Sequence, residues 1–228
     1  MINFKKQFIV TFVLFVLTIL FFEYTNTDIW IENIFYNFST HTWLIDRNEK
    51  ILKFIFYDGI KKLLIIVAVL MLLSLIVFRR NKIVNEYKKG LIVVILSAIF
   101  VPVVVGGLKA VTNTPCPKNT VIYGGIYPEV KVLESYPKNF HQKGKIKCWP
   151  AGHASGGFAL LSLFFLFKSP KNKKRAIILS MIVGWSMGLY KMMIGDHYLS
   201  HTLVTMFLAW IIILIIARIV KPEDFTQI

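Results

Sequence analysis

Six apolar runs, separated by polar and basic segments, constrain this chain more than any other feature of its sequence. They span residues 8–22, 63–78, 91–108, 154–167, 176–189 and 202–219. A helix needs about 20 apolar residues to cross the hydrocarbon core of a bilayer. With 56% hydrophobic and 17% charged residues, the chain is too apolar for an ordinary soluble domain. We therefore predict an all-α bundle of six transmembrane helices that forms one integral membrane domain over residues 1–228.

The first run follows two lysines, an arrangement shared with signal peptides. No small-x-small cleavage site comes after it, so we expect an uncleaved first transmembrane helix. Residues 28–58 mix aromatic and polar side chains, which is typical of an amphipathic segment at the membrane interface. We expect this segment to cap the bundle and the second span to begin near residue 63. The fourth and fifth runs are short, and they cross the bilayer only if the polar motifs at their outer ends lie in the interface.

The formal net charge of +15 does not indicate nucleic-acid binding, because the basic residues punctuate apolar runs rather than cluster on a soluble face. We therefore predict a membrane partner and no nucleic acid. Basic residues are densest in the tails and in the short loops at residues 79–89 and 168–175. The positive-inside rule places these segments in the cytoplasm. The longest polar loop, residues 109–152, then faces outward.

Three groups of polar residues lie at the outward ends of the apolar runs. One is the stretch 149–158, Trp-Pro-Ala-Gly-His-Ala-Ser-Gly-Gly-Phe, and the others begin at lysines just beyond the third and fifth runs. Pro150 favours the first turn of a helix, and Gly152 lets backbone N–H groups approach a ligand closely. His153 would then lie at the positive end of a helix dipole, where anions bind. The pattern indicates a phosphate site.

The same groups hold the side chains that phosphoryl transfer requires. If they meet, Lys109 and Lys191 neutralise phosphate oxygens. The backbone amides of Gly152 and His153 donate to the same oxygens. The imidazoles of His153 and His197 then flank the phosphorus, so that one attacks in line while the other protonates the leaving oxygen. This pair needs no metal, and its product is a phosphohistidine that water or another acceptor resolves.

His197 and His201 have the i, i+4 spacing that a metal could use. No carboxylate pattern such as His-Glu-x-x-His accompanies them. Two cysteines without a Cys-x-x-Cys pair do not form a zinc site of their own. We therefore predict no metal and no cofactor.

In order and spacing, the three groups resemble the motifs of the type 2 phosphatidic acid phosphatases, a membrane branch of the fold shared with vanadium haloperoxidases. The family motifs are Lys-x6-Arg-Pro, Pro-Ser-Gly-His and Ser-Arg-x5-His-x3-Asp. The matching positions are Lys109, Pro117, Pro150, Gly152, His153 and His197. The resemblance implies a six-helix bundle of this type, with His197 as the nucleophile and His153 as the general acid.

Several letters of the motifs differ in this chain. Cys116, Ala151 and His201 stand where the family has arginine, serine and aspartate. Lys191 replaces a second arginine, which keeps the charge but loses the bidentate fork. We take Lys118, which follows the first motif, as the candidate that restores the charge lost at Cys116.

The change at position 201 bears on catalysis. His201 can orient the His197 imidazole only if its facing nitrogen is unprotonated. An orienting group without a fixed negative charge stabilises imidazolium less well than an aspartate does. We therefore expect either slower catalysis, or replacement of the missing carboxylate by Asp196 or another acid.

The two cysteines, Cys116 and Cys148, each lie within two residues of a motif proline on the outward loop. In an oxidising compartment a disulfide between them would tie the first motif to the second. By the chain-entropy model, such a bond would stabilise the fold by about 3 kcal/mol.

The variant pattern, which ends in His-x-x-Ser-His, looks like a Gram-negative subgroup of the family. We therefore expect a multi-pass protein of the bacterial inner membrane whose site faces the periplasm. The predicted function is metal-independent hydrolysis of a lipid phosphate or diphosphate at the outer leaflet, with lipid A, undecaprenyl diphosphate or phosphatidate as the type of substrate. Two alternatives stay open: a phosphotransferase that passes the group to a second lipid, and a non-catalytic relative that binds anionic lipid.

Overall fold

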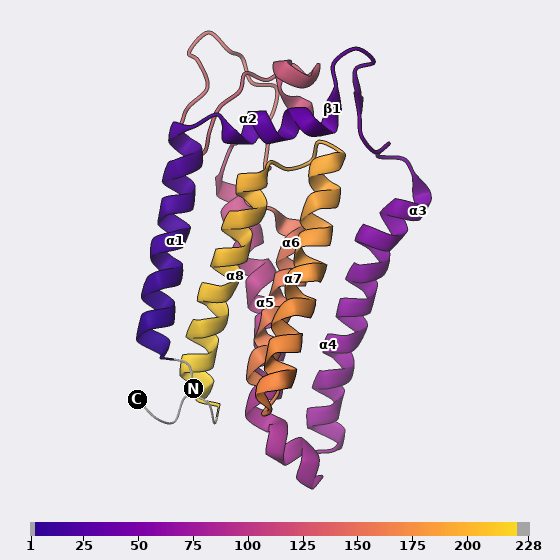
Figure 1. Cartoon of the computed structure of the whole chain (residues 1–228), viewed down its shortest axis with the longest axis vertical. Helices are drawn as coiled ribbons and strands as arrows, with labels where there is room; N and C mark the ends of the chain where they lie inside the picture. The colour runs from indigo at the N-terminus through magenta and orange to yellow at the C-terminus, as the bar shows by residue number, and fades with distance from the viewer. Residues whose placement is uncertain (1–2, 223–228) are drawn as a thin grey trace.

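The computed structural model describes residues 3–222 as a bundle whose long helices run side by side (Figure 1). The five longest helices are α1 (Phe4–Tyr24), α4 (Ile60–Val77), α5 (Lys82–Val111), α7 (Pro170–Met193) and α8 (Leu199–Val220). In the described part of the chain, the strands β1 (Tyr36–Asn37) and β2 (Thr42–Trp43) form one antiparallel hairpin. The prediction of a mostly helical membrane protein is confirmed.

Five helical stretches within residues 3–222 are long and apolar enough to cross a membrane. Four are α1, α5, α7 and α8, and the fifth is the continuous stretch Lys50–Val77. That stretch comprises α3 (Lys50–Lys53), the π-helical turn η2 (Phe54–Gly59) and α4. The remaining predicted span corresponds to a shorter apolar helix made of α6 (Gly152–Ala159) and the 3-10 stretch η5 (Leu160–Phe165). The chain is a multi-pass membrane protein, and its sixth crossing stays a prediction.

The expected start of the second span near residue 63 was wrong. The helix begins at Lys50, where the Glu49 carboxylate accepts hydrogen bonds from backbone N–H groups of the first turn. Charged residues at positions 58, 61 and 62 interrupt the apolar run and conceal the continuity of this helix. Only the part before it lies across the end of the bundle, as expected for a capping segment (Figure 1). That part contains α2 (Thr27–Glu32), η1 (Asn33–Phe35) and the hairpin.

Helix α8 forms the centre of the bundle and packs against α1, α5 and α6. Its inward side chains include Val204, Ala209 and Ile213, which have no exposed surface. Because lipid tails are as apolar as these side chains, close packing holds membrane helices together. Gly157 of α6 and Gly184 of α7 show how close the packing is, since a Cβ on Gly157 would lie 2.6 Å from the Gly184 Cα.

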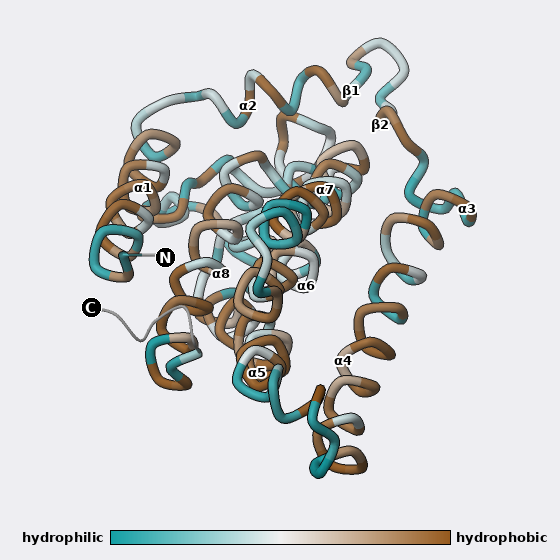
Figure 2. The backbone as a smooth tube through the Cα atoms, turned by 60° about the horizontal axis from the view of Figure 1, so that its bottom comes forward, coloured by the Kyte–Doolittle hydropathy of each residue, from teal (hydrophilic) through white to brown (hydrophobic). Residues whose placement is uncertain are grey.

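Helix α4 lies at the edge of the bundle, away from α8 (Figure 2). None of its residues is buried. Leu63, Ile66 and Leu70 each expose more than half of their surface. A helix that is apolar all round and exposed to this extent is stable only in lipid. The face of α4 turned toward the bundle contacts α5 and α6, so α4 is a wall between the protein interior and the bilayer.

The three polar groups singled out in the sequence lie at the same end of the bundle. Here α2, the hairpin, the loop after α5 and the connection between α7 and α8 come together (Figure 1). The loop after α5 carries two short 3-10 helices, η3 (Pro117–Asn119) and η4 (Val121–Tyr123). Helix α1 begins and α8 finishes at the opposite end. We name the first the outer end after the predicted topology, and the side of the membrane that it faces stays a prediction.

Candidate active site

Three histidines meet at the outer end. His153 lies in the first turn of α6, His197 in the connection between α7 and α8, and His201 in the first turn of α8. The ring centroids of His153 and His197 are 6.1 Å apart, and those of His197 and His201 are 5.6 Å apart. His197 and His201 each expose only 2% of their surface. Residues that are far apart in the sequence therefore share one buried site.

Tyr57, from η2, is the hydrogen-bond partner of His153. Its hydroxyl lies 3.0 Å from His153 Nε2, and the two rings pack edge to face with centroids 4.6 Å apart. His153 Nδ1 is buried and has no hydrogen-bond partner among the described residues. The sequence analysis did not single out Tyr57, because it is one of many aromatic residues before α4. Its role becomes visible only where η2 packs beside α7.

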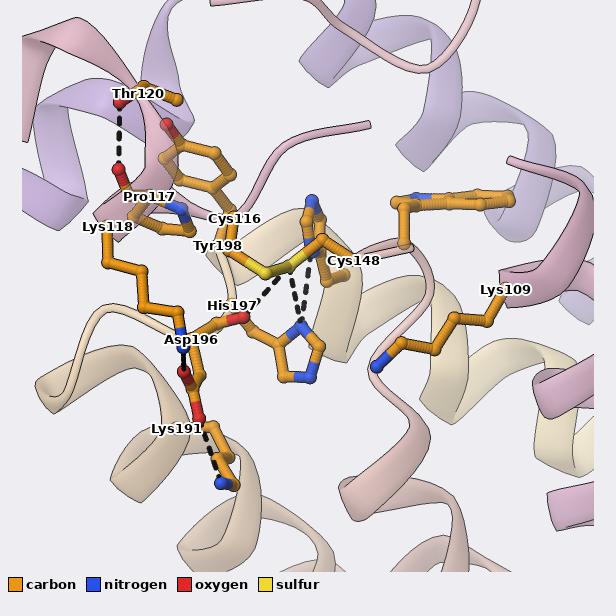
Figure 3. Close-up of a disulfide and its surroundings, with 12 residues drawn as sticks. Lys109, Cys116, Pro117, Lys118, Thr120, Cys148, Lys191, Asp196, His197 and Tyr198 are labelled. Atoms are coloured by element: carbon orange, nitrogen blue, oxygen red, sulfur yellow. Dashed lines mark hydrogen bonds and ion pairs between the residues drawn. A yellow bond between two sulfur atoms is a disulfide. The ribbon is translucent and has the colours of Figure 1, made fainter. Parts of the chain in front are cut away.

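Two groups lie beside Nδ1 of the His197 imidazole: the ring of His201 and the sulfur of Cys148, the second of which is labelled in Figure 3. His197 Nδ1 lies 3.4 Å from His201 Nδ1 and 3.6 Å from Cys148 Sγ. Burial lowers the pKa of His197 well below its usual value, and the nearby His201 and Lys109 lower it further. The imidazole is therefore neutral near pH 7 and has one unprotonated nitrogen. Because Nδ1 faces His201 and Cys148, Nε2 is the nitrogen left to face a substrate.

Cys116 and Cys148 form a disulfide whose Cα atoms are 5.2 Å apart. The bond connects the loop after α5 to the residues that precede α6, and so joins the first polar group to the second. A second link fixes the start of α6. The backbone N–H of Ala151, the residue that replaces the family's serine, donates to the carbonyl of His201 at 3.2 Å.

Asp196 is the common ion-pair partner of three cationic side chains at the site. Its carboxylate accepts hydrogen bonds from Lys191 Nζ at 2.9 Å and Lys118 Nζ at 2.5 Å, and Arg47 Nη2 lies 3.2 Å from it. Burial acts to raise the pKa of Asp196, but the charges of Lys191 and Lys118 outweigh burial and hold that pKa below its usual value. Arg47 precedes α3, outside all three motifs, so motif comparison could not find it.

This arrangement revises two expectations. Asp196 does not replace the missing acid beside His197, because its carboxylate is directed at cations and forms no hydrogen bond to an imidazole in the described part of the chain. Lys191 is not a free cation, because Asp196 already neutralises it. The Lys191 Nζ also lies 4.4 Å from the ring centre of Tyr57. Phosphate binding by Lys191 stays a prediction, and it requires the lysine to share its charge with Asp196.

Lys109, in the last turn of α5, has no ion-pair partner among the described residues. Figure 3 shows its side chain directed toward the His197 imidazole. Gly152 lies beside this side chain, since a Cβ there would be 3.9 Å from Lys109 Nζ, an ordinary contact distance. No side chain caps the first N–H groups of α6. Lys109 and this helix end together present positive charge to the space beside the imidazoles.

A cavity of about 550 Å³ extends from His153 into the bundle between α4, α5 and α6. Its outer end is lined by His153, Lys109 and Gly152. The rest of its lining is mostly apolar and includes Ala68 and Met71 of α4. The site is therefore continuous with an apolar space whose outer wall, α4, faces lipid.

A second cavity, of about 250 Å³, lies on the other side of Tyr57 and His153, which line both cavities. Four of its nine lining residues are charged: Arg47, Lys53, Lys191 and Asp196. The His153 and Tyr57 pair thus marks the boundary between an apolar space and a cationic one.

The sequence matches the PAP2 superfamily over residues 89–224. Neither a curated protein nor a solved structure matched the chain. The matched segment covers more than half of the 228 residues and contains the three polar groups that meet at the outer end of the bundle. The chain therefore belongs to the PAP2 superfamily.

Proposed function

We propose that the protein hydrolyses a lipid phosphate or diphosphate at the outer leaflet of the membrane, through a phosphohistidine on His197 and without a metal. Family membership supports a phosphatase-type function. The observation that carries the proposal is the placement of His153, which lines a cavity that reaches into the bundle, with its ring centroid 6.1 Å from that of His197.

The spacing of the two rings suits one phosphorus atom between them. In-line attack needs a nitrogen about 3 Å from the phosphorus and a proton donor within about 3 Å of the leaving oxygen. In the first step His197 Nε2 forms a bond to phosphorus while the bond to the lipid oxygen breaks. His153, protonated when the phosphate dianion is bound, gives its proton to that oxygen.

The second step returns the enzyme to its starting state. His153, now neutral, takes a proton from water, and the resulting hydroxide displaces phosphate from His197 Nε2. His201 positions the nucleophile through its Nδ1, which lies 3.4 Å from His197 Nδ1. Lys109 and the N–H groups at the start of α6 stabilise the negative charge that develops on the phosphoryl oxygens.

The shape of the larger cavity favours a lipid over a soluble ester. Its cationic outer end, with Lys109 and Lys61, would hold a phosphate headgroup. The apolar side chains that line the cavity along α4 would hold part of a hydrocarbon tail. In this proposal a lipid enters the cavity from the bilayer beside α4, which contacts lipid on its outer face and the cavity on its inner face.

Phosphate release by purified protein from phosphatidate, an isoprenoid diphosphate and lipid A tests the proposal. We expect release from at least one substrate, unaffected by EDTA, and a loss of at least about 10³-fold in kcat for His197→Ala, since covalent catalysis is removed. His141→Ala, at an exposed histidine of the outer loop, is the matched control. Base-stable, acid-labile radiolabel on the protein would identify the phosphohistidine.

The same experiment separates the alternatives. Transfer of label to a second lipid without free phosphate would indicate a phosphotransferase. Retained lipid binding with no turnover of any substrate would indicate a non-catalytic relative and would overturn the proposal.

A further inference from the structure

A cluster of metal-ligand atoms lies beside the proposed nucleophile. Cys148 Sγ and one ring nitrogen each of His197 and His201 all lie within 4.8 Å of one another, and all three residues are buried. Two of the separations are 3.6 Å, from Cys148 Sγ to His197 Nδ1, and 3.4 Å, between the two Nδ1 atoms. The fold therefore brings a sulfur and two imidazoles to one point.

These separations are those of a tetrahedral zinc site. With Zn–N bonds of about 2.05 Å and a Zn–S bond of about 2.3 Å, two ligand nitrogens lie roughly 3.4 Å apart and a sulfur lies roughly 3.6 Å from a nitrogen. The imidazoles are also in the state that zinc requires, because burial keeps His197 neutral. What prevents binding is the disulfide, since a sulfur bonded to Cys116 is not a thiolate.

We propose that reduction of the Cys116–Cys148 disulfide converts this cluster into a zinc site with Cys148, His197 and His201 as ligands and Cys116 as the fourth. A dithiol reductant supplies the two electrons and two protons that turn the disulfide into two thiols, and is itself oxidised to a disulfide. Zinc then displaces both thiol protons. The two thiolates balance the charge of the ion, so the loaded site adds no net positive charge beside Lys109.

The site would stop the reaction proposed above, and this consequence rests on that proposed function. Zinc on Nδ1 of His197 leaves the proton of the neutral imidazole on Nε2, the nitrogen that would attack phosphorus. The reduced, zinc-bound protein would have no nucleophile, whereas the oxidised protein would be insensitive to zinc. Zinc binding itself does not depend on whether the protein is a phosphatase.

Two variants test the site, and because both lack the disulfide, each is a control for its loss in the other. Each variant keeps three of the four proposed ligands. Cys116→Ser frees the Cys148 thiol, whose sulfur lies beside the imidazoles, whereas Cys148→Ser leaves only Cys116, whose sulfur is not part of that cluster. Zinc is titrated against a chromophoric chelator into oxidised and reduced wild type and into both variants. Cobalt replaces zinc in a parallel series, because a thiolate-to-cobalt charge-transfer band reports sulfur ligation directly.

We expect one zinc per chain in the reduced wild type, none in the oxidised wild type, and one in Cys116→Ser without reductant. Cys148→Ser should bind zinc more than about 100-fold more weakly than Cys116→Ser. A loss of this size exceeds the effect of losing an outer-shell partner and so indicates the loss of a direct ligand. Equal affinity of the two variants, or no gain on reduction of the wild type, would overturn the proposal. Thermal unfolding shows whether both variants are folded, and the reduced wild type decides the matter if one is not.

Discussion

The hydroxyl of Tyr57 lies 3.0 Å from Nε2 of His153, at the boundary between the apolar cavity beside α4 and the cationic cavity around Asp196. A residue outside every family motif thus holds the imidazole proposed as general acid. Five predictions follow from the arrangement of these parts.

Removal of the Tyr57 hydroxyl should slow the reaction without unfolding the protein. Tyr57→Phe keeps the ring that packs on Lys191 but loses the hydrogen bond that orients His153. We expect kcat to fall by about 10- to 100-fold, within the contribution of general acid catalysis, with KM nearly unchanged. Tyr24→Phe, at an exposed position, is the control, and an unchanged kcat for Tyr57→Phe would exclude this positioning role.

Asp196 should stabilise the fold at neutral pH and not in acid. Because its pKa is held below the usual value, its contribution is present above the unfolded pKa, about 4, and is lost as the pH falls through the lowered pKa. Asp196→Asn leaves the Lys191 charge buried without a partner, which should cost about 3 kcal/mol at pH 7. Thermal unfolding in detergent at pH 7 and at a pH well below 4, with exposed Asp46→Asn as the control, measures the difference, which should shrink at the lower pH.

The fall of the reaction rate in acid should begin at a lower pH than an ordinary histidine nucleophile would give. A lowered pKa keeps His197 neutral, and so nucleophilic, at pH values where a solvated imidazole with a pKa of about 6.5 would already be protonated. We expect kcat/KM, which reports groups of the free enzyme, to show no fall from about pH 7 to about pH 6. A fall with a midpoint near 6.5 would show that His197 is more exposed than in this structure.

Two adjacent glycines of α6 should differ in their tolerance of a methyl group. A Cβ at position 157 meets the backbone of Gly184 at 2.6 Å, whereas a Cβ at position 156 meets only the end of the Leu64 side chain at 3.5 Å. Gly157→Ala should therefore destabilise the protein by about 1–3 kcal/mol, as overpacking does, and displace His153. Gly156→Ala should be close to neutral, and equal melting temperatures for the two variants would show that α6 and α7 can separate at little cost.

A bulky residue in the apolar cavity should impair lipid turnover selectively. Ala68 lines the cavity on the inner face of α4, while Val69 is exposed on that helix. Ala68→Trp should raise KM for a long-chain lipid phosphate by about tenfold, equivalent to about 1.4 kcal/mol of binding free energy, and leave hydrolysis of a short soluble phosphate ester unchanged. Val69→Trp should affect neither. An equal loss of activity toward both substrates would show that the hydrocarbon tail does not bind in this cavity.

Local signals in the sequence were sufficient for the class of the protein. Apolar runs of membrane length predict helices wherever they occur, because lipid offers no partner for an unpaired backbone group. The order and spacing of the motifs singled out His153 and His197, which the fold brings together, and their catalytic roles stay predictions. The start of the second span at Lys50 was not predicted. The helix continues through charged residues, so the apolar run alone does not show where it begins.

Only the tertiary structure decided how the charges of the site are shared. Lys191, Lys118 and Arg47 come from three different segments, and their common partner, Asp196, is one residue from the proposed nucleophile. The same holds for Tyr57, whose contact with His153 depends on how η2 packs. A sequence states which groups are available, but the partner that each one takes depends on distance. Electrostatic and hydrogen-bond energies change when the distance between two groups changes by a few ångströms. Those distances depend on how helices that are far apart in the chain pack together.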